Sequence, residues 1–252
     1  VKPEQTANQD IAIVGMACRF PEADNKEQFW QNLAQGKNSI RPFPEKRREQ
    51  LTSIEDDDIE LFNGGFLDSV EEFDNDYFNI PPAIAKHMDP YHRLFLQNLI
   101  ETIEDAGYNR TDLQGKNVGI YAGNDHTHRL FSNYLNFIED KDFNSITGSW
   151  TAVFASRLAY LLNLQGPALV IDTSCSSGLV AMDYAIKGLQ DGDCESALVG
   201  AANLFFAPGK GIVGDVENDD FMVRTFDNKA SGTVWGEGVA SFMLKTSPQT
   251  VP

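Results

Sequence analysis

One cysteine, Cys175, occupies a position where a nucleophile could act. It follows the apolar run "ALVID" (168–172) and precedes "GLVAMDYAIKGL" (178–189), a mostly apolar segment that is typical of a buried helix. Unpaired N–H groups and the macrodipole at the start of a helix favour an anion, so a thiol there can lose its proton near neutral pH. The same N–H groups could stabilise an oxyanion during acyl transfer. The pattern indicates acyl-transfer chemistry; a small structural cysteine is the alternative.

The histidines that could act as a base or a metal ligand are His87, His92, His126 and His128. His87 and His92 flank a helix start, and we expect a surface or cap-adjacent role for both. The alternating pair in "DHTH" (125–128) is too small a ligand set for a metal site. Activation of Cys175 by one of these histidines, as in Cys–His hydrolases, is a weaker alternative. We predict no metal site and no bound cofactor.

The composition excludes several classes of protein. The 252-residue chain has a net charge of −17, whereas a nucleic-acid binder needs a basic surface. With 42% hydrophobic and 11% aromatic residues, the chain is able to bury a core. No run of about 18 apolar residues is present, so we predict no membrane span. Three scattered cysteines fit a reducing, cytoplasmic setting better than a disulfide framework.

Alternating strands and helices are predicted to position these residues. Short apolar runs predict strands at 11–17, 117–123, 168–172, 196–206 and 238–245, and the first and third of these strands read as buried. Helices are predicted at 25–36, 88–108 and 149–163 and after Cys175. The second has the clearest boundaries, with Asp89 as N-cap, Pro90 at the first helical position and Gly107 as left-handed cap. This alternation predicts an α/β fold with a largely parallel sheet.

The stretch "DTSCSSGLVAM" (172–182) resembles the active-site signature of the β-ketoacyl synthase domains (ketosynthases) of modular polyketide synthases, most often D-T-A-C-S-S-S-L. Ser174 replaces the usual alanine and Gly178 the usual serine. The resemblance continues in "DIAIVGMACRFPEA" (10–23) and "RTFDNKASGTVWGEGVASFMLK" (224–245), and it covers residues 10–245 in consistent order. The wording of the motifs leans toward synthases of the trans-acyltransferase type.

The resemblance implies a thiolase-like fold, of which this chain is the first of two duplicated halves, with a mainly parallel or mixed sheet and buried helices. It implies that Cys175 accepts an acyl chain from the phosphopantetheine arm of an acyl carrier protein. Decarboxylative condensation with a malonyl-type unit would follow. The family also dimerises through the strand at 168–172, which implies a homodimeric synthase. The residues that bind substrate are not identified by the sequence.

Two histidines serve the second half-reaction in this family, in H-G-T-G-T and N-x-G-H motifs, and no histidine of this chain lies in either motif. We therefore expect this chain alone to be inactive in condensation. It is a fragment of a longer ketosynthase, one half of a split enzyme completed by a C-terminal half in cis or in trans, or a degenerate scaffold. A non-catalytic scaffold of a synthase complex is the main alternative function, and a Cys-dependent thioester hydrolase is a weaker one.

The remaining candidates have structural and functional interpretations. Cys18 and Cys194 are predicted to be structural or surface thiols. Glu237 and Asp227 match positions with which the family shapes loops near its active site, and they either support the site from behind or only stabilise their loops. Thr173 and Ser176 are expected to help set the turn around Cys175. A basic cluster either is solvated surface or docks an acidic carrier protein; it comprises Arg41, Lys46, Arg47 and Arg48.

We assign residues 1–9 to a linker, 10–246 to the N-terminal part of the ketosynthase domain and 247–252 to a tail.

Overall fold

The computed structural model describes residues 10–51, 62–125, 134, 138, 140–206, 220 and 222–247. The predicted linker at 1–9 and most of the predicted tail lie outside these ranges. None of the helices in the described ranges is both long enough and apolar enough to cross a membrane.

A five-stranded mixed sheet forms the centre of the molecule, in the order β1-β7-β6-β4-β5. Its strands are β1 (Ile11–Arg19), β4 (Val118–Gly123), β5 (Ala168–Ile171), β6 (Ser196–Asn203) and β7 (Gly238–Thr246). β4 pairs in parallel with both β5 and β6, whereas β7 runs antiparallel to β6 and to β1. The predicted α/β class with a mixed sheet is therefore confirmed, but parallel pairs do not predominate, because β7 returns between β6 and β1.

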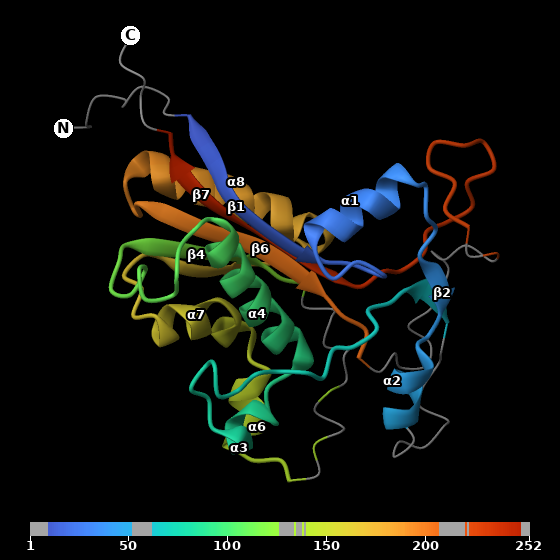
Figure 1. Cartoon of the computed structure of the whole chain (residues 1–252), viewed down its shortest axis with the longest axis horizontal. Helices are drawn as coiled ribbons and strands as arrows, with labels where there is room; N and C mark the ends of the chain where they lie inside the picture. Colours follow the sequence, from blue (N-terminus) through green and yellow to red (C-terminus); the bar gives the residue numbers. More distant parts are fainter. Residues whose placement is uncertain are drawn as a thin grey trace.

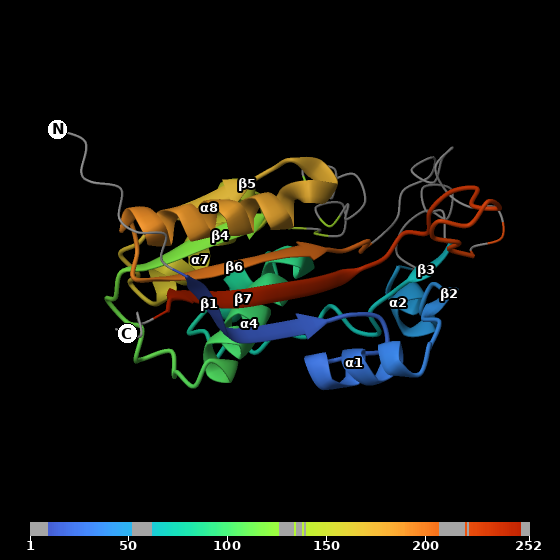
Figure 2. The same ribbon diagram turned by 90° about the horizontal axis from the view of Figure 1, so that it is seen from above.

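Helices cover the two faces of this sheet unequally. On one face lie α4 (Pro90–Asp105) and α7 (Thr151–Leu161), packed against Ile120, Leu198 and Met243 of the sheet. On the other face lies α8 (Ser177–Asp191), packed against the alternate residues of the same strands. Figures 1 and 2 show α8 on the opposite side of the sheet from α4 and α7. A three-layer α/β/α arrangement results, and within the described ranges α8 forms its third layer.

The predicted helix boundaries are confirmed where capping residues mark them. The Asp89 carboxylate accepts a hydrogen bond from the Tyr91 backbone N–H at 3.0 Å, which caps α4, and Gly107 follows that helix with φ +82°. In α1 (Lys26–Ala34) the Asn25 side chain accepts from the Gln28 N–H at 2.9 Å. In both helices the cap satisfies an N–H that has no partner within the helix.

Two predicted burial patterns are wrong. β1 and β5 were expected to be buried strands, but they are the two edges of the sheet, and Ile13 and Leu169 are 51% and 44% exposed. α8 was expected to be buried on all sides, but Leu179 on its outer face is 77% exposed. The apolar composition of these segments matches burial, yet the described residues contain no second layer that covers them.

Short elements that the sequence pattern did not predict lie between the main ones. β2 (Ile40–Pro42) pairs antiparallel with β3 (Asn63–Gly65), and α2 (Glu45–Gln50) lies beside this ribbon at one end of the main sheet (Figures 1 and 2). α3 (Pro82–Ala85) and α6 (Phe143–Gly148) are also short. Elements of three to six residues are too short to show a hydrophobic period.

The packing of β1 on α4 leads to a stability prediction. A Cβ atom at Gly15 would lie 2.5 Å from the Thr102 carbonyl oxygen and 2.6 Å from Ala106 Cβ, so Gly15→Ala forces the strand away from the helix. We expect it to lower the free energy of unfolding by about 1–3 kcal/mol. The matched control is Gly236→Ala, whose Cβ has its nearest neighbour at 3.9 Å. Denaturant unfolding measures both, and equal stability of the two variants would refute the close contact.

Candidate active site

Cys175 lies at an exposed turn in the wall of a pocket. It belongs to η3 (Ser174–Ser176), a single 3₁₀ turn between the end of β5 and the start of α8, and its side chain is exposed. The pocket beside it has a volume of about 380 Å³. It is bounded by the Cys175 turn, by the carboxyl ends of β4 and β6, and by residues 235–240. The predicted sequence of strand, sharp turn, cysteine and helix is therefore present.

The turn is held in an uncommon backbone conformation. Ser174 has φ +56°, a left-handed value that non-glycine residues seldom adopt, and its N–H donates to the Asp172 carboxylate at 3.1 Å. The Ser177 hydroxyl accepts from the Thr173 N–H at 2.9 Å and lies 2.8 Å from the Asn124 carbonyl oxygen. Ser177 thus ties the cysteine turn to the end of β4, a role that the sequence analysis missed.

The two positions that depart from the ketosynthase signature both lie at this pocket. The Ser174 hydroxyl is 3.8 Å from the Cys175 sulfur and 3.3 Å from an Asp125 carboxylate oxygen, so it lies between the thiol and a carboxylate. A Cβ atom on Gly178 would lie 3.3 Å from Ala201 Cβ. That contact is tight, so a serine here would require a small shift of Ala201, and the glycine lets the start of α8 lie close to β6 at the pocket.

Asn124 connects the cysteine turn to α4. Its N–H donates to the Ile171 carbonyl oxygen at 2.9 Å, and its side-chain oxygen accepts from the Tyr91 hydroxyl at 2.9 Å. Burial raises the pKa of Tyr91 well above its ordinary value, and nearby carboxylates, including that of Asp89, raise it further. Tyr91 therefore remains a hydroxyl donor, and this bond holds the strand end next to Cys175 in place.

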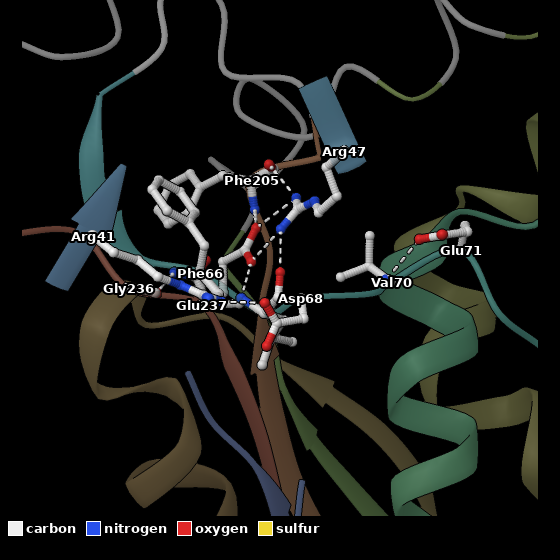
Figure 3. A network of polar contacts seen from close by, with 11 residues as sticks. Arg41, Arg47, Phe66, Asp68, Val70, Glu71, Phe205, Gly236 and Glu237 are labelled. Atoms are coloured by element: carbon white, nitrogen blue, oxygen red, sulfur yellow. Dashed lines mark hydrogen bonds and ion pairs between the residues drawn. The ribbon is translucent and has the colours of Figure 1, made fainter. Parts of the chain in front are cut away.

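A buried ion pair lies behind the opposite wall of the pocket (Figure 3). The Arg47 guanidinium donates to both carboxylate oxygens of Glu237, at 2.6 and 2.9 Å, and Arg47 is only 2% exposed. Its assignment to a surface cluster that is solvated or docks a carrier was therefore wrong. A sequence pattern does not reveal its burial, because the acidic partner lies far away in the chain.

The other members of the basic cluster have acidic neighbours at the surface. Arg41 lies 2.8 Å from the Asp68 carboxylate, and Lys46 lies 3.1 Å from that of Glu71. These local pairs reduce the positive charge that the cluster could offer to an acidic carrier protein. Docking of a carrier protein through Arg41, Lys46 and Arg48 stays a prediction.

Glu237 acts on loop structure rather than on the Cys175 sulfur directly. Besides Arg47, its carboxylate accepts from the backbone N–H groups of Leu67 at 2.8 Å and Phe205 at 2.9 Å. Asp227, the other acidic residue singled out, is exposed and accepts from the Lys229 N–H at 2.8 Å. The hydrogen bonds of Asp227 are local to its loop, whereas those of Glu237 join separate segments of the chain beside the pocket.

The described histidines lie away from the lining of the Cys175 pocket. Both are buried, so the expected surface role is wrong. His87 Nδ1 lies 2.6 Å from the Ser145 hydroxyl and 3.1 Å from the carboxylate of Asp142, the N-cap of α6, which is a different helix from the one whose start His87 precedes. His92 packs against Phe154, with ring centroids 5.2 Å apart.

The predicted pair in "DHTH" falls on His126 and His128, which lie outside the described residues. Within the described ranges, no group of three or more histidine, cysteine, aspartate or glutamate residues is arranged to hold a metal ion.

Comparisons with known proteins agree with the geometry of the site. The family model described as "Beta-ketoacyl synthase, N-terminal domain" matches residues 8–250. Polyketide synthase PksL of Bacillus subtilis is 38% identical over 93% of the chain, and the pikromycin polyketide synthase component PikAII of Streptomyces venezuelae is 35% identical over 94%. The chain spans only 5% and 7% of the length of these two relatives.

Solved ketosynthase structures resemble the chain over nearly all of its length. The ketosynthase from module 6 of the bacillaene synthase of Bacillus subtilis has a TM-score of 0.79 and 38% identity, covering 93% of this chain and 39% of that one. An oxazolomycin ketosynthase domain of Streptomyces albus has a TM-score of 0.78 and 31% identity, and the match covers 94% of this chain and 43% of the oxazolomycin ketosynthase chain. The predicted thiolase-like fold is thereby confirmed.

The different surroundings of the three thiols predict their order of alkylation. Burial raises the pKa of Cys18 and of Cys194, so both carry less thiolate than a free thiol at a given pH, and both are shielded. We expect iodoacetamide at about pH 7 to modify exposed Cys175 at least about ten times faster than either buried thiol. Intact-mass measurement over time follows the reaction. If Cys175→Ala took up the label as fast as the unaltered chain, the assignment would be wrong.

Proposed function

The chain belongs to the β-ketoacyl synthase family, and from this membership we propose that it forms the acyl-accepting part of a polyketide ketosynthase, with Cys175 as the nucleophile. The observation that carries the proposal is the exposure of Cys175 at a strained turn, in a pocket formed at the carboxyl ends of β4 and β6. The other two cysteines are buried away from such a turn.

The proposed reaction is a thioester exchange. The Cys175 thiolate attacks the carbonyl carbon of an acyl group carried on the phosphopantetheine arm of an acyl carrier protein. A new carbon–sulfur bond forms, the bond to the pantetheine sulfur breaks, and the leaving thiolate takes up the proton that Cys175 released. The Ser177 N–H, the first of α8, donates to the Ser174 carbonyl oxygen, so the support proposed for the thiolate and the tetrahedral oxyanion comes from the positive end of the α8 macrodipole.

We propose that condensation requires groups supplied from outside these 252 residues. None of the four histidines of the chain lies in the two histidine motifs that serve this step in the family, and neither described histidine lines the Cys175 pocket. Support comes from the uncovered apolar side chains of Leu179 on α8 and of Trp30 on α1, which are 77% and 70% exposed. A C-terminal ketosynthase half, in cis or in trans, is the proposed partner that covers them.

A homodimeric synthase is the proposed assembly. β5 pairs with β4 on one side only, and its other edge is not paired by any described strand. An open strand edge is able to pair with a second copy.

The cytoplasmic setting stays a prediction.

A non-catalytic scaffold is the second candidate function. The open edge of β5 favours it, because dimerisation through this edge needs no reactive thiol. A thioester hydrolase that uses an internal histidine receives no support from the described residues, since the pocket beside Cys175 is lined by no histidine among them.

Acylation of Cys175 separates the enzyme from the scaffold. We expect an acyl-N-acetylcysteamine thioester to add one acyl group to the protein, because the exposed thiol attacks the thioester carbonyl. Intact mass reports the adduct, and Cys175→Ala is expected to abolish it, whereas Cys194→Ala retains it. If no adduct formed even after the C-terminal half had been added, the scaffold would be the better description.

Condensation by the chain alone is expected to be absent. Supplied with an acyl donor and a carrier-bound malonyl unit, the chain should release no β-ketoacyl product, because groups that polarise the malonyl thioester and support the enolate are missing. Mass spectrometry of the carrier protein measures the product. Detection of a β-ketoacyl carrier without any partner chain would disprove this prediction.

A further inference from the structure

The ion pair between Arg47 and Glu237 belongs to the pocket although neither group contacts the Cys175 sulfur. Glu237 lies in the pocket wall, within the segment 235–238 that faces the cysteine turn. We propose that Arg47 and Glu237 are positioning residues that hold this wall where an incoming acyl thioester must lie. The nature of that donor rests on the proposed function, whereas the position of the wall does not.

The carboxylate of Glu237 joins three segments that are distant in the chain. Both of its oxygens accept from Arg47 of α2, and they also accept from the Leu67 and Phe205 N–H groups. The Glu237 side chain is completely buried, and the dashed lines in Figure 3 show its hydrogen bonds meeting at the carboxylate. Charge-assisted bonds at this depth are strong and directional, so the carboxylate defines where its own backbone lies.

The backbone around Glu237 transmits that position to the pocket. The Glu237 N–H donates to the Gly65 carbonyl oxygen at 2.7 Å, and the Gly65 N–H donates to the Trp235 carbonyl oxygen at 2.9 Å. On the pocket side, the Asn203 side chain donates to the Gly236 carbonyl oxygen at 2.8 Å. The wall is therefore fixed on both sides, and it has little freedom to shift while Glu237 stays in place.

Arg47 is suited to this role by the planar fork of its guanidinium. Besides Glu237, it donates to the carbonyl oxygens of Leu67 at 3.1 Å and Phe205 at 2.9 Å. Arg47 and Glu237 therefore bind the backbone of the same two residues. Arg47 donates to their carbonyl oxygens, and Glu237 accepts from their N–H groups. A lysine would keep the charge but could not make these paired contacts. Loss of the arginine would leave a buried carboxylate without its cation, and Glu237 would have to move.

Two variants and a matched control test the proposal. Glu237→Gln removes the charge with little change of shape, and Arg47→Lys keeps the charge but loses the fork. The control is Arg48→Lys, the same change at the neighbouring, largely exposed position. Two rates are measured for each protein: acylation of Cys175 by an acyl-N-acetylcysteamine thioester, which needs the wall, and alkylation by iodoacetamide, which needs only an exposed thiol.

We expect Glu237→Gln to slow acylation by about 10- to 100-fold, because a displaced wall misorients the donor. The acylation rate of Arg47→Lys should lie between those of Glu237→Gln and the unaltered protein. The acylation rate of Arg48→Lys should equal that of the unaltered protein. Alkylation should change less than about twofold in every case, since the turn itself is held by Ser177 and Asn124. Unchanged acylation in Glu237→Gln, or equal loss with both reagents, would overturn the proposal.

Hydrogen–deuterium exchange keeps the test independent of the proposed function. If the unaltered protein accepted no acyl group, the proposed function would fail, but the position of the wall would still be measurable. We expect faster exchange in peptides that contain residues 235–238 of Glu237→Gln and of Arg47→Lys, with no change in peptides of α4. Exchange that rose equally throughout the protein, or that did not rise in the wall, would refute a positioning role.

Discussion

The close approach of α8 to the end of β4 is the constraint on which the site depends. A Cβ atom on Gly123 would lie 2.6 Å from the backbone nitrogen of Gly178, so a glycine is required for the helix to start there. Parallel pairing of β4 with β5 and β6 brings the carboxyl ends of three strands to the same edge. The chain has to pass from β5 into α8 within one 3₁₀ turn, and this turn exposes Cys175 at the pocket.

Polar groups hold the pocket in place from two sides, by neutral hydrogen bonds on one side and by an ion pair on the other. On one side, Ser177, Asn124 and Tyr91 make a chain of neutral hydrogen bonds that connects the turn to α4. On the other side, Arg47 and Glu237 make a charged pair that connects the opposite wall to α2. Desolvation makes such a pair costly, so it contributes little net stability, but either member alone would be far more costly to bury. The pair therefore specifies position more than it stabilises the fold.

Uncovered apolar surface is the other general feature of this structure. The sheet edges β1 and β5 and the outer face of α8 expose large apolar side chains that the described residues do not cover. The chain covers about two fifths of the two solved ketosynthases described above. Its family membership and its exposed faces lead to the same proposal, in which acyl acceptance belongs to this part and condensation needs a partner.

Local sequence patterns were sufficient to predict the main helices and strands and the turn that carries Cys175. Capping residues such as Asp89 and Gly107 act locally, and short apolar runs and the signature around Cys175 are readable without any contact between distant residues. Tertiary contacts were needed to place β1 and β5 at the edges of the sheet, to bury Arg47 and to bring Glu237 to Leu67 and Phe205. These outcomes depend on strand order and on partners far apart in the chain, and a local pattern of residue types carries no information about either.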